Sequence, residues 1–396
     1  MKHLFVTQDF GPDRGGMARR HVELARRFSG ETESMEVSTV SFDGADVFDR
    51  NEQYAIHRQP FPFREANRFS NQMKWAGWLT RFCRDRIEVI HCGNIRPVGY
   101  AVAWASMRVG IPYIVYVNGG DLLREMQKAK KSTLKRVTAR LIFERASGIA
   151  ATSRWVADLT DAVMEQVGVK VLPPVAALDL GTDPTMFSPA RDTGRLREKW
   201  GVGDSPLMLT VARLVPHKGQ DVGIRVLASL QNEFPALRYV LVGEGHDETR
   251  LRALALELGV GEKVVFAGAI DEDDLPEAYA TSTVYVGPSR VDNEINVEGF
   301  GISFLEASAS GLPVVAGDSG GVRSAVRDGE TGFVLPPQDV KAWSDAIWRL
   351  LRDDTLRRTM GSAGRAAVES HYNWERVARD TREFTLSVIG PHRRLR

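Results

Sequence analysis

Short apolar runs alternate with longer amphipathic stretches throughout the chain. In the first half, buried strands are predicted at residues 2–8, 37–42, 89–91, 113–117 and 148–152. The first strand is followed by a loop over residues 9–16 and an amphipathic helix over residues 17–28. Strands separated by helices are typical of a parallel sheet with crossover connections. The first half therefore predicts one doubly wound domain.

A second series of the same kind begins after a proline- and glycine-rich stretch at residues 173–189. Strands are predicted there at residues 207–212, 239–242, 264–267, 284–287, 313–316 and 332–335. Two such series predict an α/β fold of two doubly wound, Rossmann-like domains, residues 1–185 and residues 186–373. Because ligands of such sheets bind outside the carboxyl ends of the strands, we expect them in the cleft between the two domains.

The composition agrees with two globular domains. A chain of 396 residues with 43% hydrophobic and 26% charged residues is too long for one core and too balanced for disorder. The net charge of +1 argues against a nucleic-acid-binding protein, in which one sign of charge dominates. Residues 1–190 carry 26 basic and 21 acidic side chains (+5), which leaves 26 and 30 (−4) for residues 191–396. We therefore expect an anionic partner at the first half.

Cysteine content and hydropathy predict a cytoplasmic location. Cys83 and Cys92 are too few for a disulfide framework, and no Cys/His cluster has the spacing of a metal site. The amino-terminal apolar run is too short for a signal peptide. No window approaches the run of about 18 apolar residues that a membrane-spanning helix needs. We expect a reducing compartment and no bound metal.

Two loops are candidate phosphate sites. Gly15 and Gly16 stand between the first strand and the first helix, where backbone N–H groups can hold an anion, although a plain tight turn explains them equally well. Arg213 and Lys218 follow the strand at residues 207–212, and two cations there suit a diphosphate. The alternative is a pair of solvated loop cations, but their position at the predicted cleft favours the diphosphate.

A pair of glutamates in the second domain is a stronger indication of a ligand site than the two phosphate loops. Glu298 falls in a glycine loop, and Glu306 lies eight positions later in the helix that the loop feeds. Carboxylates accept hydrogen bonds from neighbouring hydroxyls, so one can hold a sugar and the other a ribose, while amides at the helix start face phosphate. A capped surface helix is the alternative, and the spacing alone favours neither.

These loops, together with the trailing segment at residues 316–321, resemble the retaining glycosyltransferases of family 4, which have the GT-B fold. The resemblance implies that Glu306 binds the donor ribose and that Glu298 binds the transferred sugar with the amides of Phe300 and Gly301. The residues that it assigns to the donor are Gly15, Gly16, Arg213, Lys218, Gly243, Gly268, Ile270, Glu298, Gly299, Phe300, Gly301, Ile302 and Glu306. It also implies that a carboxyl-terminal helix, about residues 374–396, crosses back onto the first domain.

Within the family, the chain is most similar to phosphatidylinositol mannosyltransferases and related lipid or polysaccharide mannosyltransferases. This likeness implies GDP-mannose as donor, a hydroxyl acceptor and front-face transfer without metal or cofactor, stabilised by Arg213 and Lys218. Such enzymes usually carry a histidine near the donor sugar, after a strand like that at residues 113–117. Here the position holds Asn118, which bonds hydroxyls but does not titrate, and Asp121 is the nearest substitute. The catalytic candidates are therefore Arg213, Lys218, Glu298, Asn118 and Asp121.

Three other functions stay open. The donor could be a UDP-sugar and the acceptor soluble, since the nucleobase can be read by backbone atoms of the loops at residues 243–246 and 268–271. A nucleotide-sugar epimerase of the same fold would convert the donor with no acceptor present. A non-catalytic nucleotide-sugar-binding protein is kept open by the missing histidine.

Two segments of the first half suit an anionic membrane surface. Residues 123–141 are expected to form one basic amphipathic helix, with Arg124, Lys128, Lys131 and Lys135 along one face. Residues 61–86 hold an apolar stripe of Trp75, Trp78, Leu79 and Phe82 among arginines and lysines. Such stripes more often belong to the core, and such charged faces are usually solvated. We therefore give equal weight to two hypotheses: peripheral contact with the inner face of the cell membrane, and a purely soluble role.

Overall fold

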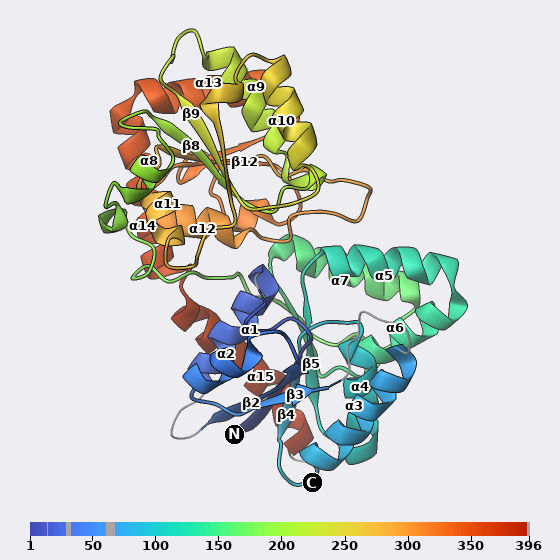
Figure 1. The fold of residues 1–396 in the computed structure, drawn as a ribbon. Coiled ribbons are helices and arrows are strands. Elements are labelled where there is room, and N and C mark those ends of the chain that lie inside the picture. The colour runs from blue at the N-terminus through green and yellow to red at the C-terminus, as the bar shows by residue number, and fades with distance from the viewer. Residues whose placement is uncertain (14, 29–32, 61–67, 394–396) are drawn as a thin grey trace. The chain divides into compact units, whose positions relative to one another are not determined.

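The computed structural model describes residues 1–13, 15–28, 33–60 and 68–393. The chain forms two compact units, each built on one sheet: Met1–Asp179 with Trp374–Arg396 (unit 1), and Leu180–Asn373 (unit 2) (Figure 1). The amino-terminal segment of unit 1 thus ends at residue 179, whereas the prediction placed this boundary at residue 185. The backbone N–H of Thr182 donates to the carbonyl of Tyr372 at 2.9 Å, and this bond ties the segment after Leu180 to unit 2.

Within the described residues, unit 1 has a parallel sheet of seven strands in the order β3-β2-β1-β4-β5-β6-β7. The strands are β1 (Lys2–Val6), β2 (Ser34–Val40), β3 (Ile56–Gln59), β4 (Val89–Cys92), β5 (Tyr113–Val117), β6 (Gly148–Ala151) and β7 (Val175–Ala177). The helices are α1 (Gly16–Arg27), α2 (Ala45–Asn51), α3 (Arg68–Cys83), α4 (Val98–Val109), α5 (Gly120–Lys131), α6 (Thr133–Arg145), α7 (Arg154–Val167) and α15 (Trp374–Arg393).

Alternation along the strands divides the core of unit 1 between two faces of the sheet. Leu4, Val6 and Val115 point to the face that α3, α4, α6 and α7 cover, where they join one buried apolar cluster. On the other face α15 packs against α1 and β6. The carboxyl-terminal helix is therefore part of unit 1; residues 394–396 of the predicted helix lie outside the described residues.

Unit 2, which the structure describes in full, has a parallel sheet of six strands in the order β10-β9-β8-β11-β12-β13. The strands are β8 (Leu207–Val211), β9 (Arg238–Val242), β10 (Val264–Gly268), β11 (Val284–Gly287), β12 (Val314–Gly317) and β13 (Gly332–Leu335). Its helices are α8 (Arg195–Lys199), α9 (Gln220–Leu230), α10 (Glu248–Glu257), α11 (Leu275–Ala280), α12 (Ile302–Ala309), α13 (Val340–Arg352) and α14 (Asp354–Ser370), with short 3₁₀ turns at Pro189–Arg191, Pro216–Lys218, Gly261–Lys263 and Val322–Ser324.

Each apolar run that predicted a strand is a strand in the structure, which confirms the prediction of an α/β fold of two doubly wound units. Two strands lack that signal: β3 has the polar sequence Ile-His-Arg-Gln, and β7 has only three residues, none of them fully buried. Both lie at the ends of the unit 1 sheet. An edge strand has a neighbour on one side alone, so it needs no continuous apolar run.

The prediction of one continuous basic helix over residues 123–141 is wrong, because the structure has two helices there, α5 and α6. The chain breaks at Ser132, which has extended backbone angles and caps the start of α6 by accepting a hydrogen bond from the Lys135 N–H at 3.3 Å. Because α5 ends at Lys131, the four cations do not share one helix face. The Ser132 hydroxyl thus accepts from the Lys135 N–H, which in a continuous helix would donate to a backbone carbonyl.

The aromatic stripe of residues 61–86 is mostly core. Trp75 and Leu79 are fully buried, and the indole N–H of Trp75 donates to the Ser38 hydroxyl at 2.9 Å. Trp78 and Phe82 are half-buried and stack on each other at 4.4 Å between ring centres. Residues 61–67 of this segment lie outside the described residues.

Each sheet has one position at which its strand order reverses direction. In unit 1 it lies between β1 and β4, and in unit 2 between β8 and β11. Loops on either side of such a reversal diverge, so the carboxyl edge there is the place where open α/β sheets bind ligands. Among the described helices, none has the length and apolarity that a bilayer crossing requires.

Histidines are buried on the α1 face of the unit 1 sheet. His3 Nδ1 lies 2.9 Å from His91 Nε2, and His91 Nδ1 lies 2.8 Å from the Tyr116 hydroxyl. Burial lowers the pKa of His3 to about 4 and that of His21 to about 3, and it holds the pKa of His91 well below its usual value. These side chains are neutral in the folded protein at neutral pH.

This burial makes unit 1 sensitive to acid. Below pH 6.5, the ordinary histidine value, the unfolded chain binds a proton at His3 that the folded chain does not bind until about pH 4. As the pH falls from 6.5 to 4, we expect the unfolding free energy of the wild type to drop by about 3 kcal/mol relative to that of His3→Gln. Above pH 6.5, His3 should add no pH dependence to the unfolding free energy. Urea titrations of both proteins across the interval measure the difference, and parallel stability curves would refute the prediction.

Candidate functional site

An ion pair lies at the strand-order reversal of unit 2. Lys218 follows β8, and Glu298 lies in the long loop between β11 and α12. Lys218 Nζ is 2.5 Å from Glu298 Oε2, and the two side chains are 20% and 14% exposed. The Ser289 hydroxyl, which stands just after β11, donates to the same oxygen at 3.4 Å. The structure thus brings together two residues that are 80 positions apart in the sequence.

Two glycines hold the backbone of Glu298 in place. Gly320 has a φ of +57°, and a Cβ at this position would lie 2.3 Å from the Glu298 carbonyl oxygen. The neighbouring Gly321 N–H donates to the same carbonyl at 2.8 Å. A side chain at Gly320 would displace Glu298, because L-residues disfavour this φ and the space is filled. This packing gives a physical role to the glycines of residues 316–321.

Three loops meet at the carboxyl edge beside the ion pair. The Leu214 N–H donates to the Glu244 carbonyl at 2.9 Å, and the Gly243 N–H donates to the Gly268 carbonyl at 2.8 Å. A Cβ at Gly243 would lie 2.2 Å from the Ala212 carbonyl oxygen, so the loops after β8 and β9 pack too closely for any other residue. The predicted donor residues Gly243 and Gly268 are therefore neighbours, with half-buried Ile270 two positions farther along.

Arg213 stands at this edge with an exposed side chain. Its carbonyl accepts a hydrogen bond from Gln220 Nε2 at 2.9 Å, which fixes the backbone at the end of β8. Within the described residues its guanidinium has no ion-pair partner. Neighbouring His217 adds no positive charge at neutral pH, because burial and the Lys218 ammonium lower its pKa to about 4. Arg213 and Lys218 are therefore the positively charged side chains of the loop after β8 at neutral pH.

Glu306 lies on α12 and is only 8% exposed. The Tyr279 hydroxyl, on α11, donates to Glu306 Oε2 at 2.7 Å. Gly301 precedes α12 with a φ of +96°, so the chain turns sharply between Glu298 and the helix. The other predicted members of this turn are half-buried Gly299 and Ile302 and buried Phe300. Tyr279 was missed in the sequence, where nothing distinguishes it from a core tyrosine.

In unit 1, the predicted Asn118 and Asp121 stand together after β5. Asp121 Oδ1 accepts hydrogen bonds from the N–H groups of Asn118 at 3.0 Å and Leu122 at 2.9 Å. Asp121 Oδ2 and Asn118 Nδ2 are buried and have no hydrogen-bond partner among the described residues. Burial raises the pKa of Asp121 above its usual value. Two unsatisfied polar atoms at a strand end leave hydrogen-bonding capacity for a ligand.

Arg20, on α1, is a charged residue of this region that the sequence did not distinguish from its neighbouring arginines. It is fully buried, and none of its side-chain nitrogens has a hydrogen-bond partner among the described residues. Its guanidinium lies 4.6 Å from the centre of the Tyr116 ring. Burial lowers its pKa to about 10, while Tyr116 and Asp121 act in the opposite direction.

The reversal between β1 and β4 also carries polar side chains. Asn94 Nδ2 donates to Asp9 Oδ2 at 2.5 Å, and both residues are buried. Gly15 and Gly16 follow as the exposed start of α1, which has no acidic residue in its first turn and no side-chain cap. Their amides can face an anion, as predicted, although the geometry equally suits a turn. Among the described residues, no group of three His, Cys, Asp or Glu side chains could hold a metal ion.

Family models match both units. The model "Glycosyl transferases group 1" matches residues 192–367, and the model "Glycosyl transferase 4-like domain" matches residues 15–174. The chain is 32% identical over 382 residues to the GDP-mannose-dependent alpha-(1-6)-phosphatidylinositol monomannoside mannosyltransferase of Mycolicibacterium smegmatis, with 94% of each chain covered. It is 28% identical to a monoacylated phosphatidylinositol monomannoside mannosyltransferase of Corynebacterium glutamicum, over 94% of this chain and 95% of the relative.

Solved structures resemble the chain over nearly its whole length. Anabaena Alr3699/HepE in complex with UDP and glucose superposes with a TM-score of 0.77 at 22% identity, covering 98% of this chain and 99% of its own. Sucrose-phosphate synthase from Thermosynechococcus elongatus gives a TM-score of 0.75 at 21% identity, with the same shares covered. These likenesses confirm the predicted GT-B fold class.

Gly320 provides a test of the packing around Glu298. Gly320→Ala should lower the melting temperature more than Gly329→Ala, because both positions have a positive φ but a Cβ at Gly329 meets nothing within 4 Å. Alanine at a positive φ costs roughly 1 kcal/mol in either case, and the contact with the Glu298 carbonyl adds to that cost at Gly320 alone. Equal melting temperatures of the two variants would contradict the described contact.

Proposed function

The chain belongs to the group 1 glycosyltransferases, the retaining family 4 with the GT-B fold, and from this premise we propose that it transfers mannose from GDP-mannose to a lipid-linked hydroxyl acceptor. The activity class follows from the family. The donor and acceptor are supported by the names of the mycobacterial and corynebacterial relatives, which act on phosphatidylinositol monomannoside with GDP-mannose.

The contact between Lys218 and Glu298 at the strand-order reversal is the observation that carries this proposal. A cation and a carboxylate held together there suit a diphosphate and a sugar in adjacent positions. In the donor complex, Lys218 and Arg213 face the diphosphate, Glu298 accepts hydrogen bonds from sugar hydroxyls, and Glu306 accepts them from the ribose. The glycine-rich turn before α12 adds backbone amides to the phosphate.

The proposed chemical step needs no nucleophile from the protein. The bond between the anomeric carbon and the diphosphate oxygen breaks, and the acceptor oxygen attacks from the same face. The acceptor proton passes to the departing diphosphate oxygen. Arg213 and Lys218 stabilise the negative charge that grows on this oxygen, which is electrostatic catalysis on a positioned pair of substrates. We propose that these two cations suffice without a metal.

The proposal also assigns residues of unit 1 to the donor. Asn118 Nδ2 and Asp121 Oδ2, which lack partners among the described residues, are the groups proposed for sugar hydroxyls. Gly15 and Gly16 are proposed to bind the distal phosphate through their amides. A lipid-linked acceptor places the protein at the cytoplasmic face of a membrane as a peripheral protein.

Lys218 and Glu306 test the proposal. Lys218→Ala and Glu306→Ala should each lower the rate of mannose transfer from GDP-mannose to phosphatidylinositol monomannoside by about a hundredfold or more, because each removes a charge that faces the donor. Lys341→Ala is the matched control, since Lys341 is an exposed lysine of the same unit that pairs with Asp345. Both test variants should remain folded by circular dichroism. Transfer rates close to that of the control would overturn the assignment.

The same assay separates the alternative functions. An epimerase would convert the donor when the acceptor is left out, and a binding protein would release no GDP with any acceptor. Thermal unfolding with GDP-, UDP- and ADP-sugars identifies the nucleobase, because a ligand at about 100 times its Kd adds about 2.7 kcal/mol of stability. An increase of the melting temperature with UDP-sugars alone would show that the donor is a UDP-sugar and not GDP-mannose.

A further inference from the structure

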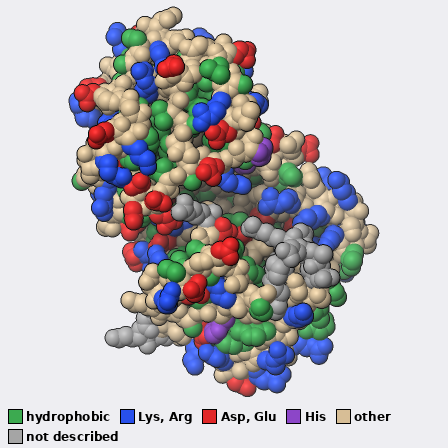
Figure 2. All heavy atoms as spheres, viewed as in Figure 1, with side chains coloured by type: hydrophobic (Ala, Val, Ile, Leu, Met, Phe, Trp, Pro, Cys, Tyr) green, Lys and Arg blue, Asp and Glu red, His purple; other side chains and the backbone are tan. Residues whose placement is uncertain are grey.

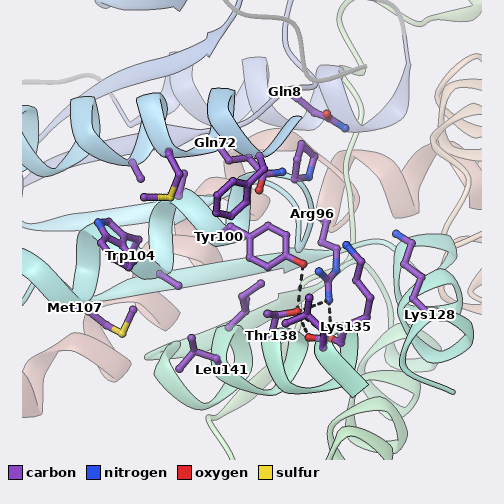
Figure 3. A pocket seen from close by; sticks show the side chains of 18 residues that line it. Gln8, Gln72, Arg96, Tyr100, Trp104, Met107, Lys128, Lys135, Thr138 and Leu141 are labelled. Carbon is purple, nitrogen blue, oxygen red and sulfur yellow. Dashed lines mark hydrogen bonds between the residues drawn. The ribbon is translucent and has the colours of Figure 1, made fainter. Parts of the chain in front are cut away.

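Unit 1 contains a cavity of about 690 Å³ between helices α3, α4 and α6, a volume within the range of small-molecule sites. Its two ends differ in chemistry (Figure 3): Trp104 and Met107 lie at one end, and the cations Arg96, Lys128 and Lys135 lie at the other. None of the residues assigned to the donor lines it. The cavity is therefore a second feature of unit 1, separate from the donor residues.

Large apolar side chains in the lining of the cavity are exposed to solvent, although side chains of this kind are normally buried. Phe69 is 77% exposed and Leu134 is 70% exposed. The other large exposed hydrophobic side chains of the lining are Met73, Trp104, Met107 and Leu141. A contiguous apolar patch of this kind on a folded protein marks a binding surface. An apolar ligand would remove these side chains from water.

The polar end carries an excess of positive charge. Arg96 and Lys128 both pair with the buried carboxylate of Glu125. Lys128 Nζ lies 3.1 Å from Glu125 Oε1. Lys135 has no ion-pair partner among the described residues, so three cations stand against one anion. The Arg96 side chain is only 9% exposed, and its Nη1 is buried without a hydrogen-bond partner among the described residues. Burial and the two neighbouring cations lower the pKa of Lys135, which an anionic ligand would reverse.

We propose that this cavity binds an acyl chain of an anionic phospholipid, with the lipid phosphate at Arg96 and Lys135. The inference rests on the proposed function, because it identifies the occupant as the lipid part of the acceptor. A chain fits the apolar end, and a phosphate satisfies both the buried Arg96 Nη1 and the uncompensated charge. A neutral apolar ligand would leave both without a partner.

The position of the cavity suits an acceptor whose headgroup is to be modified. Gln8 lines it directly after β1, and Arg96 follows β4, so its polar end lies at the reversal between these strands. Asn94 and Asp9, hydrogen-bonded to each other, stand at the same edge. A lipid anchored by its chain thus presents its headgroup at the carboxyl edge of the sheet.

The surroundings of the cavity suit the surface of an anionic membrane. Several Lys and Arg side chains are visible on the side of unit 1 on which α5 and α6 lie (Figure 2). Arg108 lies over the Trp104 ring at 4.9 Å, so a cation also flanks the apolar end. Each Lys or Arg near such a surface strengthens binding, and exposed aromatic and aliphatic side chains insert between headgroups.

The test compares acylated acceptors with a deacylated one. Phosphatidylinositol monomannosides with short chains, used as monomers, should show a KM that falls about fourfold for each methylene added, until the cavity is filled. The deacylated form should be mannosylated with a much higher KM and a similar kcat. Equal KM values for acylated and deacylated acceptors would overturn the cavity proposal and leave the proposed function intact.

Two matched pairs of variants locate the effect. Leu134→Asp should raise the KM for acylated acceptor about tenfold, whereas Val137→Asp should not, because Val137 is an exposed residue of the same helix outside the cavity. Lys135→Ala should raise the same KM, and Lys131→Ala, an exposed lysine outside the cavity, should have a smaller effect. Equal effects within each pair would contradict the location.

A binding measurement keeps the proposal testable if neither acceptor is mannosylated. Brominated lysophosphatidylinositol should quench the fluorescence of Trp104, and Trp104→Phe should remove most of that quenching. Brominated lysophosphatidylcholine, which has no net charge, should bind more weakly, and Lys135→Ala should abolish the difference. Absence of transfer with quenching present would refute the proposed function alone. Absence of quenching by the anionic lipid would refute the cavity proposal.

Discussion

The ion pair between Lys218 and Glu298 depends on the reversal of strand order between β8 and β11. Only there do the loops after two neighbouring strands diverge, so that a cation from one and a carboxylate from the other can both face a ligand. The surrounding glycines serve the same contact: Gly320 and Gly321 position the Glu298 backbone, and Gly243 allows the loops after β8 and β9 to pack. Backbone packing therefore holds the two side chains in contact.

The two units repeat one architecture with different chemistry. Unit 2 places cations and carboxylates at its reversal, which suits a diphosphate sugar. Unit 1 places the Asp9–Asn94 hydrogen bond at its own reversal, together with buried Arg20, while an apolar cavity opens between the helices on one face of its sheet. The net charge of +1 conceals a difference between the two halves, since residues 1–190 carry a net charge of +5 and residues 191–396 a net charge of −4.

The sequence predicts the central strands well, because a fully buried parallel strand requires a continuous apolar run. It misses β3 and β7, whose edge positions relax that requirement, and it misses the break at Ser132, whose cap depends on one side-chain rotamer. Lys218 and Glu298 are recognisable separately as loop residues. Their contact is not, because it depends on the order of the strands, which hydrophobic periodicity does not encode. The cavity of unit 1 is likewise hidden, since residues from separate helices line it.

A crystal structure of the protein with bound GDP-mannose tests whether Lys218 and Arg213 bind the diphosphate. We expect an oxygen of the diphosphate to lie within hydrogen-bonding distance of Lys218 Nζ and the Arg213 guanidinium, in place of the present contact between Lys218 and Glu298. Glu298 should then accept hydrogen bonds from the sugar. A nucleotide bound with the Lys218–Glu298 contact intact, and with no phosphate oxygen near either cation, would contradict this expectation.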